Sequence, residues 1–216
     1  MKYFFFIVIV ILLTACEPTE KDTKNLPWKT SITKSGATEV FGLAIGEITL
    51  KELSIGLKKI AQSALFETPN GELNIESYFG KTTIGLLEGR IIADLDASDD
   101  FLKTEKNHAK KRDSTPNNNW KYQLSTEGEA EIVNMKVWRL VYIPVAEYKE
   151  KQIKFFGEPN EIINITKTAQ YRLFPNKGIA LLWDTDGGEI FYYVAPKDFA
   201  RLKASLPMKI VRPKED

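Results

Sequence analysis

The sequence is poor in the residues that carry most metal and redox chemistry. It has one cysteine and one histidine among 216 residues. A single cysteine cannot form a disulfide within the chain. A zinc site of the Cys/His type needs three or four protein ligands, more than these two residues supply. The sequence therefore predicts neither an internal disulfide nor a Cys/His metal centre, and no cofactor is predicted.

The sequence also lacks an excess of charge of either sign. Lys and Arg number 30 and Asp and Glu number 29, which gives a formal net charge of +1. A protein this close to neutrality has no strong overall field to attract nucleic acid. Its hydrophobic content of 43% and aromatic content of 11% are typical of a chain with a packed core. We expect a globular protein with no nucleic-acid partner.

Long apolar runs are limited to the amino-terminal end. Lys2 is followed by an unbroken apolar run, residues 3–13, and then by the small residues Thr14 and Ala15 and by Cys16. A membrane-spanning helix needs about 20 apolar residues, so this run is too short to span comfortably. Its length is that of the hydrophobic region of a signal peptide.

The quartet Leu13-Thr14-Ala15-Cys16 resembles the lipobox of bacterial lipoproteins. In that family the cysteine thiol receives a diacylglyceryl group, the chain is cut before the cysteine, and the new amino terminus is acylated. The resemblance implies that residues 1–15 are a lipoprotein signal peptide and that Cys16 is the lipidation site. In that family an aspartate directly after the cysteine tends to keep the protein in the inner membrane. This chain has Glu17 at that position, so the resemblance implies the outer membrane, facing the periplasm. The alternatives are a secretory signal with an incidental cysteine and a transmembrane anchor.

The mature chain is expected to begin with a tether. Residues 16–38 are mostly polar and include Pro18, Pro27 and Gly36, a composition that cannot bury enough surface to fold alone. We expect an acylated flexible tether here, with Trp28 as the residue able to dock on the globular part.

Two similar α+β units are predicted after the tether. Residues 39–100 form the first unit and residues 120–216 the second. Residues 101–119 are almost entirely polar and indicate an exposed insertion or linker between them. In each unit a helix precedes an antiparallel β-meander on which helices pack, so the fold class is α+β. Whether the units share one core is left open.

Several elements follow from the residue pattern. Thr49-x-x-Glu52 matches a capping box, and an apolar stripe from Leu50 to Ala64 predicts a helix over residues 49–64. Two further helices are predicted, one from Pro144 to a cap at Gly157 and one over residues 196–207. A β-hairpin is predicted with its turn at Glu88-Gly89. The other expected strands are residues 39–46, 73–78, 135–144, 161–166, 169–174, 178–183 and 189–195.

Part of the second unit resembles small outer-membrane lipoproteins of the SmpA/OmlA type. The resemblance rests on Gly157-Glu158-Pro159 after a helix, and on Tyr171 and Trp183 in aromatic-rich strands. Those proteins pair helices with an antiparallel sheet and belong to the machine that inserts β-barrels. The resemblance implies a role in envelope assembly. This chain differs in being longer and in having a first unit.

Catalytic residues are not predicted. His108 lies in the polar insertion beside Lys110, without the orienting partner or pocket that a catalytic histidine needs. No Gly-x-Ser-x-Gly motif and no glycine-rich phosphate loop with its lysine are present. We therefore expect no enzymatic activity, and the basic run 110–112 is either a solvated loop or a contact for anionic head groups.

Two acidic clusters could suit a hard cation, but neither completes a site. Asp94, Asp96, Asp99 and Asp100 match no calcium loop. The run 184–187 begins like a calcium loop but lacks the later ligands, so a turn is the better interpretation. No metal site is predicted.

The last strands are rich in aromatic side chains. Neighbours along a strand point to opposite faces, so a terminal helix on one face would leave aromatic surface on the other. We therefore predict a partner-binding surface; the alternative is that helices cover both faces. Its residues are Tyr171, Trp183, Phe191 and Tyr193.

The function expected from these features is that of a lipid-anchored envelope lipoprotein. It would face the periplasm and have a non-enzymatic, protein-binding or scaffold role. The first alternative is a carrier or sensor of a small apolar ligand or lipid, held between sheet and helix. A hydrolase is a third class, for which no base and nucleophile can be named.

Overall fold

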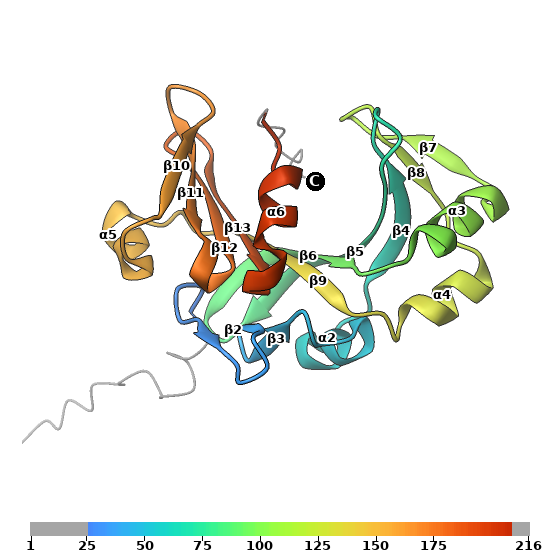
Figure 1. The fold of residues 1–216 in the computed structure, drawn as a ribbon, viewed down its shortest axis with the longest axis horizontal. Coiled ribbons are helices and arrows are strands. Elements are labelled where there is room, and N and C mark those ends of the chain that lie inside the picture. Colours follow the sequence, from blue (N-terminus) through green and yellow to red (C-terminus); the bar gives the residue numbers. More distant parts are fainter. Residues whose placement is uncertain (1–25, 209–216) are drawn as a thin grey trace, which may run out of the picture.

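One large antiparallel sheet organises the computed structural model, which describes residues 26–208. Its strands lie in the order β10-β11-β12-β13-β9-β6-β5-β4-β8-β7. Figure 1 shows the sheet bent, so that its two ends rise as wings on either side of β5, β6 and β9. The strands are β4 Gln62–Glu67, β5 Leu73–Ile84, β6 Leu87–Leu95, β7 Arg112–Ser114, β8 Trp120–Tyr122, β9 Val137–Pro144, β10 Glu161–Asn164, β11 Ala169–Phe174, β12 Ile179–Asp184 and β13 Gly188–Val194.

Helices cover both faces of this sheet. They are α2 Leu50–Leu57, α3 Asp99–His108, α4 Thr126–Ile132, α5 Glu150–Ile153 and α6 Phe199–Ser205. Helix α6 packs on one face through Phe199 and Leu202, between the two wings (Figure 1). Helices α2 to α5 contribute to the larger hydrophobic core on the other face. The predicted α+β class, with antiparallel meanders and helices packed on them, is confirmed.

The two predicted units contribute neighbouring strands to this one sheet. Strand β6, from residues 39–100, pairs with β9, from residues 120–216, over the register from Gly89↔Pro144 to Leu95↔Val137. Ile91 and Leu140, one from each half of the chain, are both fully buried in the larger core. The hydrogen-bonded ladder and the core are therefore continuous between the halves.

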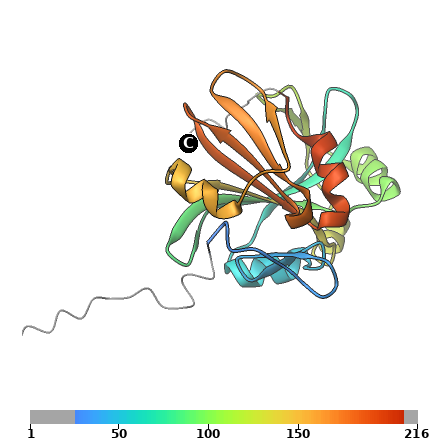
Figure 2. The same ribbon diagram turned by 60° about the vertical axis from the view of Figure 1, so that its left-hand side comes forward.

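A small sheet beneath the large one is built from the end of the expected tether, which supplies β1, and from the expected strand 39–46, which supplies most of β2 and all of β3. Its strands are β1 Ser31–Ile32, β2 Thr38–Val40 and β3 Leu43–Ile45, and Figure 2 shows this segment lying across the base of the fold. Val40 and Ile45 enter the larger core. A turn with positive φ at Phe41 and Gly42 divides the expected strand 39–46 into β2 and β3.

The described part of the expected tether, residues 26–38, is also held in place. The Tyr193 hydroxyl donates to the Pro27 carbonyl at 3.0 Å. Trp28 packs edge-on against Tyr148 and stacks on Phe155, with ring centroids 5.5 and 5.6 Å apart. The docking of Trp28 is confirmed, and the prediction of a flexible tether is wrong for residues 26–38. Residues 16–25 lie outside the described residues.

The first predicted helix is shorter than its apolar stripe suggested. The capping box is confirmed, since Glu52 accepts from the Thr49 backbone N–H at 2.8 Å and the Thr49 hydroxyl accepts from the Glu52 N–H. The helix ends at Leu57 because Lys58 takes a left-handed conformation, with φ +53°. Ile60 is then exposed, and the chain enters β4, where pairing with β5 prevails over the helical period.

Two further predictions need correction, the polar insertion and the helix after Pro144. Residues 101–119, expected to be an exposed insertion, hold most of α3 and all of β7. Leu102 is the buried anchor that the polar composition concealed. The helix after Pro144 is only α5 followed by a 3₁₀ turn, Lys154–Phe156, which ends at Gly157 with φ +82°. The terminal helix is confirmed as α6, preceded by a 3₁₀ turn at Pro196–Asp198.

The central hairpin is confirmed, but its turn is displaced from the predicted position. The connection between β5 and β6 is Gly85-Leu86, with φ +61° at Gly85. Gly89 lies instead inside β6, where a Cβ atom would collide with the ring of Tyr142 and with the Ile143 carbonyl. This glycine is needed for close packing against β9 rather than for a turn.

Candidate functional site

The aromatic residues predicted to bind a partner do not form an exposed surface. Tyr171, Phe191 and Tyr193 are at most 1% exposed, and Trp183 is half-buried. Tyr171 lies in the core beneath α6, and Phe191 and Tyr193 lie in the core on the opposite face. Both faces are covered, one by α6 and the other in part by Phe41 of the small sheet and Phe156 after α5, so the predicted aromatic surface requires correction.

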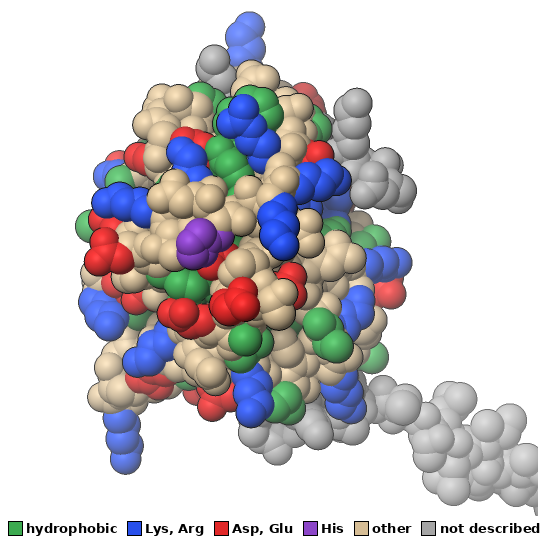
Figure 3. All heavy atoms as spheres, turned by 90° about the vertical axis from the view of Figure 1, so that its right-hand side faces the viewer, with side chains coloured by type: hydrophobic (Ala, Val, Ile, Leu, Met, Phe, Trp, Pro, Cys, Tyr) green, Lys and Arg blue, Asp and Glu red, His purple; other side chains and the backbone are tan. Residues whose placement is uncertain are grey.

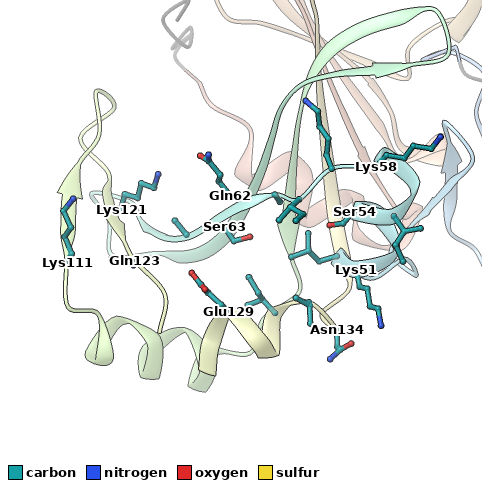
Figure 4. A pocket seen from close by; sticks show the side chains of 18 of the residues that line it. Lys51, Ser54, Lys58, Gln62, Ser63, Lys111, Lys121, Gln123, Glu129 and Asn134 are labelled. Carbon is teal, nitrogen blue, oxygen red and sulfur yellow. The ribbon is translucent and has the colours of Figure 1, made fainter. Parts of the chain in front are cut away.

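A groove of about 1160 Å³ lies in another part of the molecule, beside the first residues of β4. Its walls come from α2, from the start of β4, from β7 and β8, and from α4. Figure 4 shows β4 crossing the groove, with α4 beneath it, α2 on one side and the β7–β8 pair on the other. In that view Glu129 points from α4 towards the strand that carries Ser63.

Backbone hydrogen bonds join the two helices at the floor of this groove. The Lys51 N–H donates to the Val133 carbonyl at 2.9 Å, and the Leu50 N–H donates to the Met135 carbonyl at 3.0 Å. The end of α4 thus satisfies donors in the first turn of α2, which a helix cannot satisfy internally. The floor is therefore a hydrogen-bonded junction of two elements far apart in sequence.

Apolar side chains stand uncovered along the groove. Ile55 is 67% exposed, Ile60 is 94% exposed and Val133 is 38% exposed. Leu50 and Ile132 lie buried below them. Single exposed apolar residues are ordinary on a protein surface, but their convergence in one hollow is typical of binding sites.

Basic side chains predominate around these apolar residues. The charged residues of the groove are Lys51, Lys58, Lys59, Lys111 and Lys121, against Asp113 and Glu129. One of the acids, Asp113, is paired with Lys111 at 3.3 Å. The Lys59 ammonium donates to backbone carbonyls of β5, at Phe79 and Lys81. The groove is therefore locally basic although the whole chain is nearly neutral.

The basic run 110–112 contributes to one wall of this groove. The guanidinium carbon of Arg112 lies 4.4 Å from the ring centroid of Trp120, and Lys111 forms the ion pair with Asp113. His108 is exposed at the end of α3, on a face where basic and acidic side chains are interspersed (Figure 3). It is not among the residues that line the groove.

A second hollow, of about 430 Å³, lies near the β12–β13 turn. Glu189 lies at its wall, and burial raises the pKa of this carboxyl. Its Oε1 accepts from the Tyr148 backbone N–H at 3.2 Å, and its buried Oε2 has no hydrogen-bond partner among the described residues. Asp184 and Asp186 form the neighbouring turn, where the Asp186 N–H donates to Asp184 Oδ1 at 3.1 Å.

Two members of the first acidic cluster singled out in the sequence form ion pairs. Asp94 Oδ2 lies 2.5 Å from Arg139 Nε, and Asp96 Oδ1 lies 2.9 Å from an Arg201 nitrogen. Within residues 26–208, no group of three or more His, Cys, Asp or Glu side chains is placed to hold a metal ion.

A row of ionisable groups crosses the centre of the sheet. Glu76 on β5 lies directly opposite Asp94 on β6, which lies opposite Arg139 on β9. Asn74 donates to both carboxylates, at 3.0 Å to Glu76 and 3.3 Å to Asp94. Burial and the charge of Asp94 raise the pKa of Glu76 to about 7. The row is part of the sheet interior rather than of the groove.

The groove residues escaped prediction because their neighbours in space are distant in sequence. Ile60 was assigned to the apolar stripe of a helix, although it is nearly fully exposed. The available signal was the pair Lys58-Lys59 directly before Ile60, an unusual place for a core residue. Cys16 lies outside the described residues, so its acylation remains a prediction. In the region from 26 to 208, no helix has the length and apolar character needed to cross a bilayer.

No family model, no curated protein and no solved structure matches this chain.

Proposed function

We propose that the protein is a lipid-anchored lipoprotein of the bacterial cell envelope that binds another envelope protein in the groove between α2, β4 and α4. Cys16 would carry the acyl chains and hold the protein at the outer membrane, facing the periplasm. The role is non-enzymatic, and the protein acts by holding its partner near the membrane. The observation that carries the proposal is the convergence of exposed Ile55, Ile60 and Val133 with a basic rim.

The location part of the proposal rests on the sequence quartet that ends at Cys16. Multiple acyl chains give a stable anchor where one chain gives only weak binding. The variant Cys16→Ser should fold normally and leave the membrane fraction. A Cys16→Ser protein that still sediments wholly with membranes after high-salt washing would contradict the acyl anchor.

The binding part can be tested by photo-crosslinking in living cells. A photoreactive residue at Ile60 should capture one dominant envelope protein. The matched control is Leu86, which is 77% exposed at the tip of the β5–β6 hairpin and outside the groove. The same product from both positions, or no protein product from Ile60, would count against a protein-binding groove. Capture of lipid alone at Ile60 would favour the alternative, a lipid carrier.

A further inference from the structure

The groove contains an unpaired stretch of strand edge. Strand β4 pairs with β5 along its whole length, from Gln62 to Glu67. On its other side it pairs with β8 only over Leu65–Glu67. Among the described residues, 62–64 therefore have β5 as their only strand neighbour.

The edge is open because β8 leaves β4 at this point. After Tyr122 the chain turns towards α4, and the Gln123 N–H donates to the Lys111 carbonyl at 3.1 Å. The gap between β4 and α4 is the groove. Alternate residues of a strand direct their N–H and C=O groups to opposite sides, so part of the 62–64 backbone faces the gap. Gln62 is exposed, Ser63 is half-buried and Ala64 is 3% exposed, so the accessible part of the edge lies at Gln62 and Ser63.

An open strand edge favours an extended polypeptide as its occupant. A peptide that adds as a strand supplies both donors and acceptors to the edge, whereas an acyl chain supplies neither. Hydrogen bonds between the end of α4 and the start of α2 close the base of the gap. The groove above this base has room beside the strand for the side chains of a bound peptide.

The charge and the apolar surface of the groove indicate which side chains a bound peptide should carry. Ile55, Ile60 and Val133 offer contacts for apolar side chains, and the excess of lysine over acid favours carboxylates. In an added strand, alternate side chains point to opposite sides. A segment that alternates apolar and acidic residues would direct the apolar ones to the groove and keep the acidic ones near its lysine rim.

We propose that the groove binds an extended, acidic and apolar segment of an envelope protein, which adds as a strand to the open edge of β4 at residues 62–64. This inference rests on the proposed function and names the partner chemistry of the same site. The added strand lies between β4 and α4, and its carboxylates lie near the lysines of α2 and β8.

The test uses the full-length protein in detergent and a labelled nine-residue peptide of alternating valine and glutamate. Fluorescence anisotropy should report binding. A valine–lysine peptide, and a peptide with proline at every second position, should bind about tenfold or more weakly. Hydrogen exchange at the amides of residues 62–64 should slow when the valine–glutamate peptide is bound.

Matched variants locate the site. Ile60→Glu and Lys121→Glu should each weaken binding of the valine–glutamate peptide about tenfold. Leu86→Glu and Lys103→Glu should not change it, because Leu86 and Lys103 are exposed outside the groove. Both sets alter exposed side chains, so the fold should be retained, which circular dichroism checks.

Each other outcome overturns part of the inference. Equal binding of the proline peptide would exclude strand addition and leave the protein-binding groove intact. Binding of phosphatidylglycerol vesicles, lost in Ile60→Glu, without peptide binding would make the site a lipid site. Self-association lost in Ile60→Glu would make the occupant a second copy. No peptide binding together with no crosslink from Ile60 would overturn both this inference and the proposed function.

Discussion

At the scale of single residues, the ionisable row across the sheet has an energetic consequence. Glu76 and Asp94 are cross-strand neighbours of like charge, and only one arginine, Arg139, is opposite them in the row. Asp94 is 1% exposed and accepts a hydrogen bond from Arg139, so the arginine compensates the charge of Asp94 more directly than that of Glu76. Glu76 is left with burial and repulsion, which favour its protonated form.

We predict that Glu76→Gln raises the stability of the protein above neutral pH. The folded pKa of Glu76 is about 7 against an ordinary value of 4.5, so the folded state binds the extra proton between these values. The free energy of unfolding of the natural protein should therefore fall as pH rises from about 4.5 to 7. The rise in the pKa of Glu76 corresponds to a loss of about 3 kcal/mol in the free energy of unfolding above pH 7. Because the Glu76 side chain is partly exposed, we expect a loss of about 2 kcal/mol.

Urea unfolding at pH 5 and pH 8 checks this prediction. The gain of Glu76→Gln over the natural protein should be larger at pH 8 than at pH 5. Glu72→Gln on the same hairpin changes an exposed side chain outside the row and should leave the pH profile as it is. An equal effect of Glu76→Gln at both pH values would mean that Glu76 does not titrate in this range.

A second residue-scale prediction concerns Gly178, where the small sheet meets β13. Gly178 has φ +63°, and a Cβ atom there would collide with the Val194 carbonyl and the Thr38 hydroxyl. That hydroxyl donates to the Val194 carbonyl at 2.7 Å. Gly178→Ala should lower the free energy of unfolding by about 3 kcal/mol or more.

The control for Gly178→Ala is a substitution at another glycine that has a positive φ but no atom close to an added Cβ. Gly188 has φ +79° and nothing within 4 Å of an added Cβ. Gly188→Ala should cost only about 1 kcal/mol, the penalty for the backbone conformation. Equal losses in the two variants, measured by thermal unfolding, would show that the contact with Thr38 and Val194 is unimportant.

At the scale of elements, the sequence predicted best where the deciding contacts are local. The capping box at Thr49 and the terminal helix were found because their signals lie within a few residues. Helix α3 was missed, since its anchoring Leu102 stands among polar residues and its partners are β4 and β5. Helix α2 was extended too far, because the apolar period continues into β4 and only pairing with β5 distinguishes strand from helix.

The candidate site was predicted less well for the same reason. Alternation along β13 correctly places neighbouring aromatics on opposite faces, but it does not reveal what covers each face. Phe191 and Tyr193 are covered by elements from other parts of the chain. The groove needs α2, β4 and α4 together, and no single stretch of sequence contains all three.

An element-scale prediction follows from the way α3 holds α4. Glu105 on α3 is 4% exposed and accepts from both the backbone N–H and the hydroxyl of Ser125, each at 2.8 Å. Ser125 is the N-cap of α4, and its hydroxyl accepts from the Gly128 N–H. Glu105→Ala should lower the free energy of unfolding by about 2 kcal/mol, because the cap loses its buried acceptor.

Because α4 forms the floor of the groove, Glu105→Ala should also weaken binding of the valine–glutamate peptide. Thr104→Ala alters an exposed position of the same helix and should change stability by less than about 0.5 kcal/mol. Chemical unfolding and anisotropy measure the two effects. Loss of stability with unchanged peptide affinity would show that α4 keeps its place without this bond.

At the scale of the whole molecule, the continuous sheet predicts cooperative unfolding. Trp120 lies on β8 in one wing and Trp183 on β12 in the other. If β6–β9 pairing couples the wings, a variant that keeps only Trp120 and a variant that keeps only Trp183 should each show one transition. In each variant the midpoint from tryptophan fluorescence should equal the midpoint from circular dichroism, which reports on the whole fold. A fluorescence midpoint clearly separated from the circular dichroism midpoint of the same variant would mean that the halves unfold independently.

The docking of Trp28 sets a limit on where the protein can act. Between Cys16 and Leu26 the chain has only a short stretch, and an extended chain spans at most about 3.5 Å per residue. An anchor at Cys16 would therefore keep Leu26 within about 35 Å of the lipid surface. The groove would then lie no farther from the bilayer than this distance plus the width of the folded protein, and a partner of the proposed kind would have to bring its acidic segment within that reach.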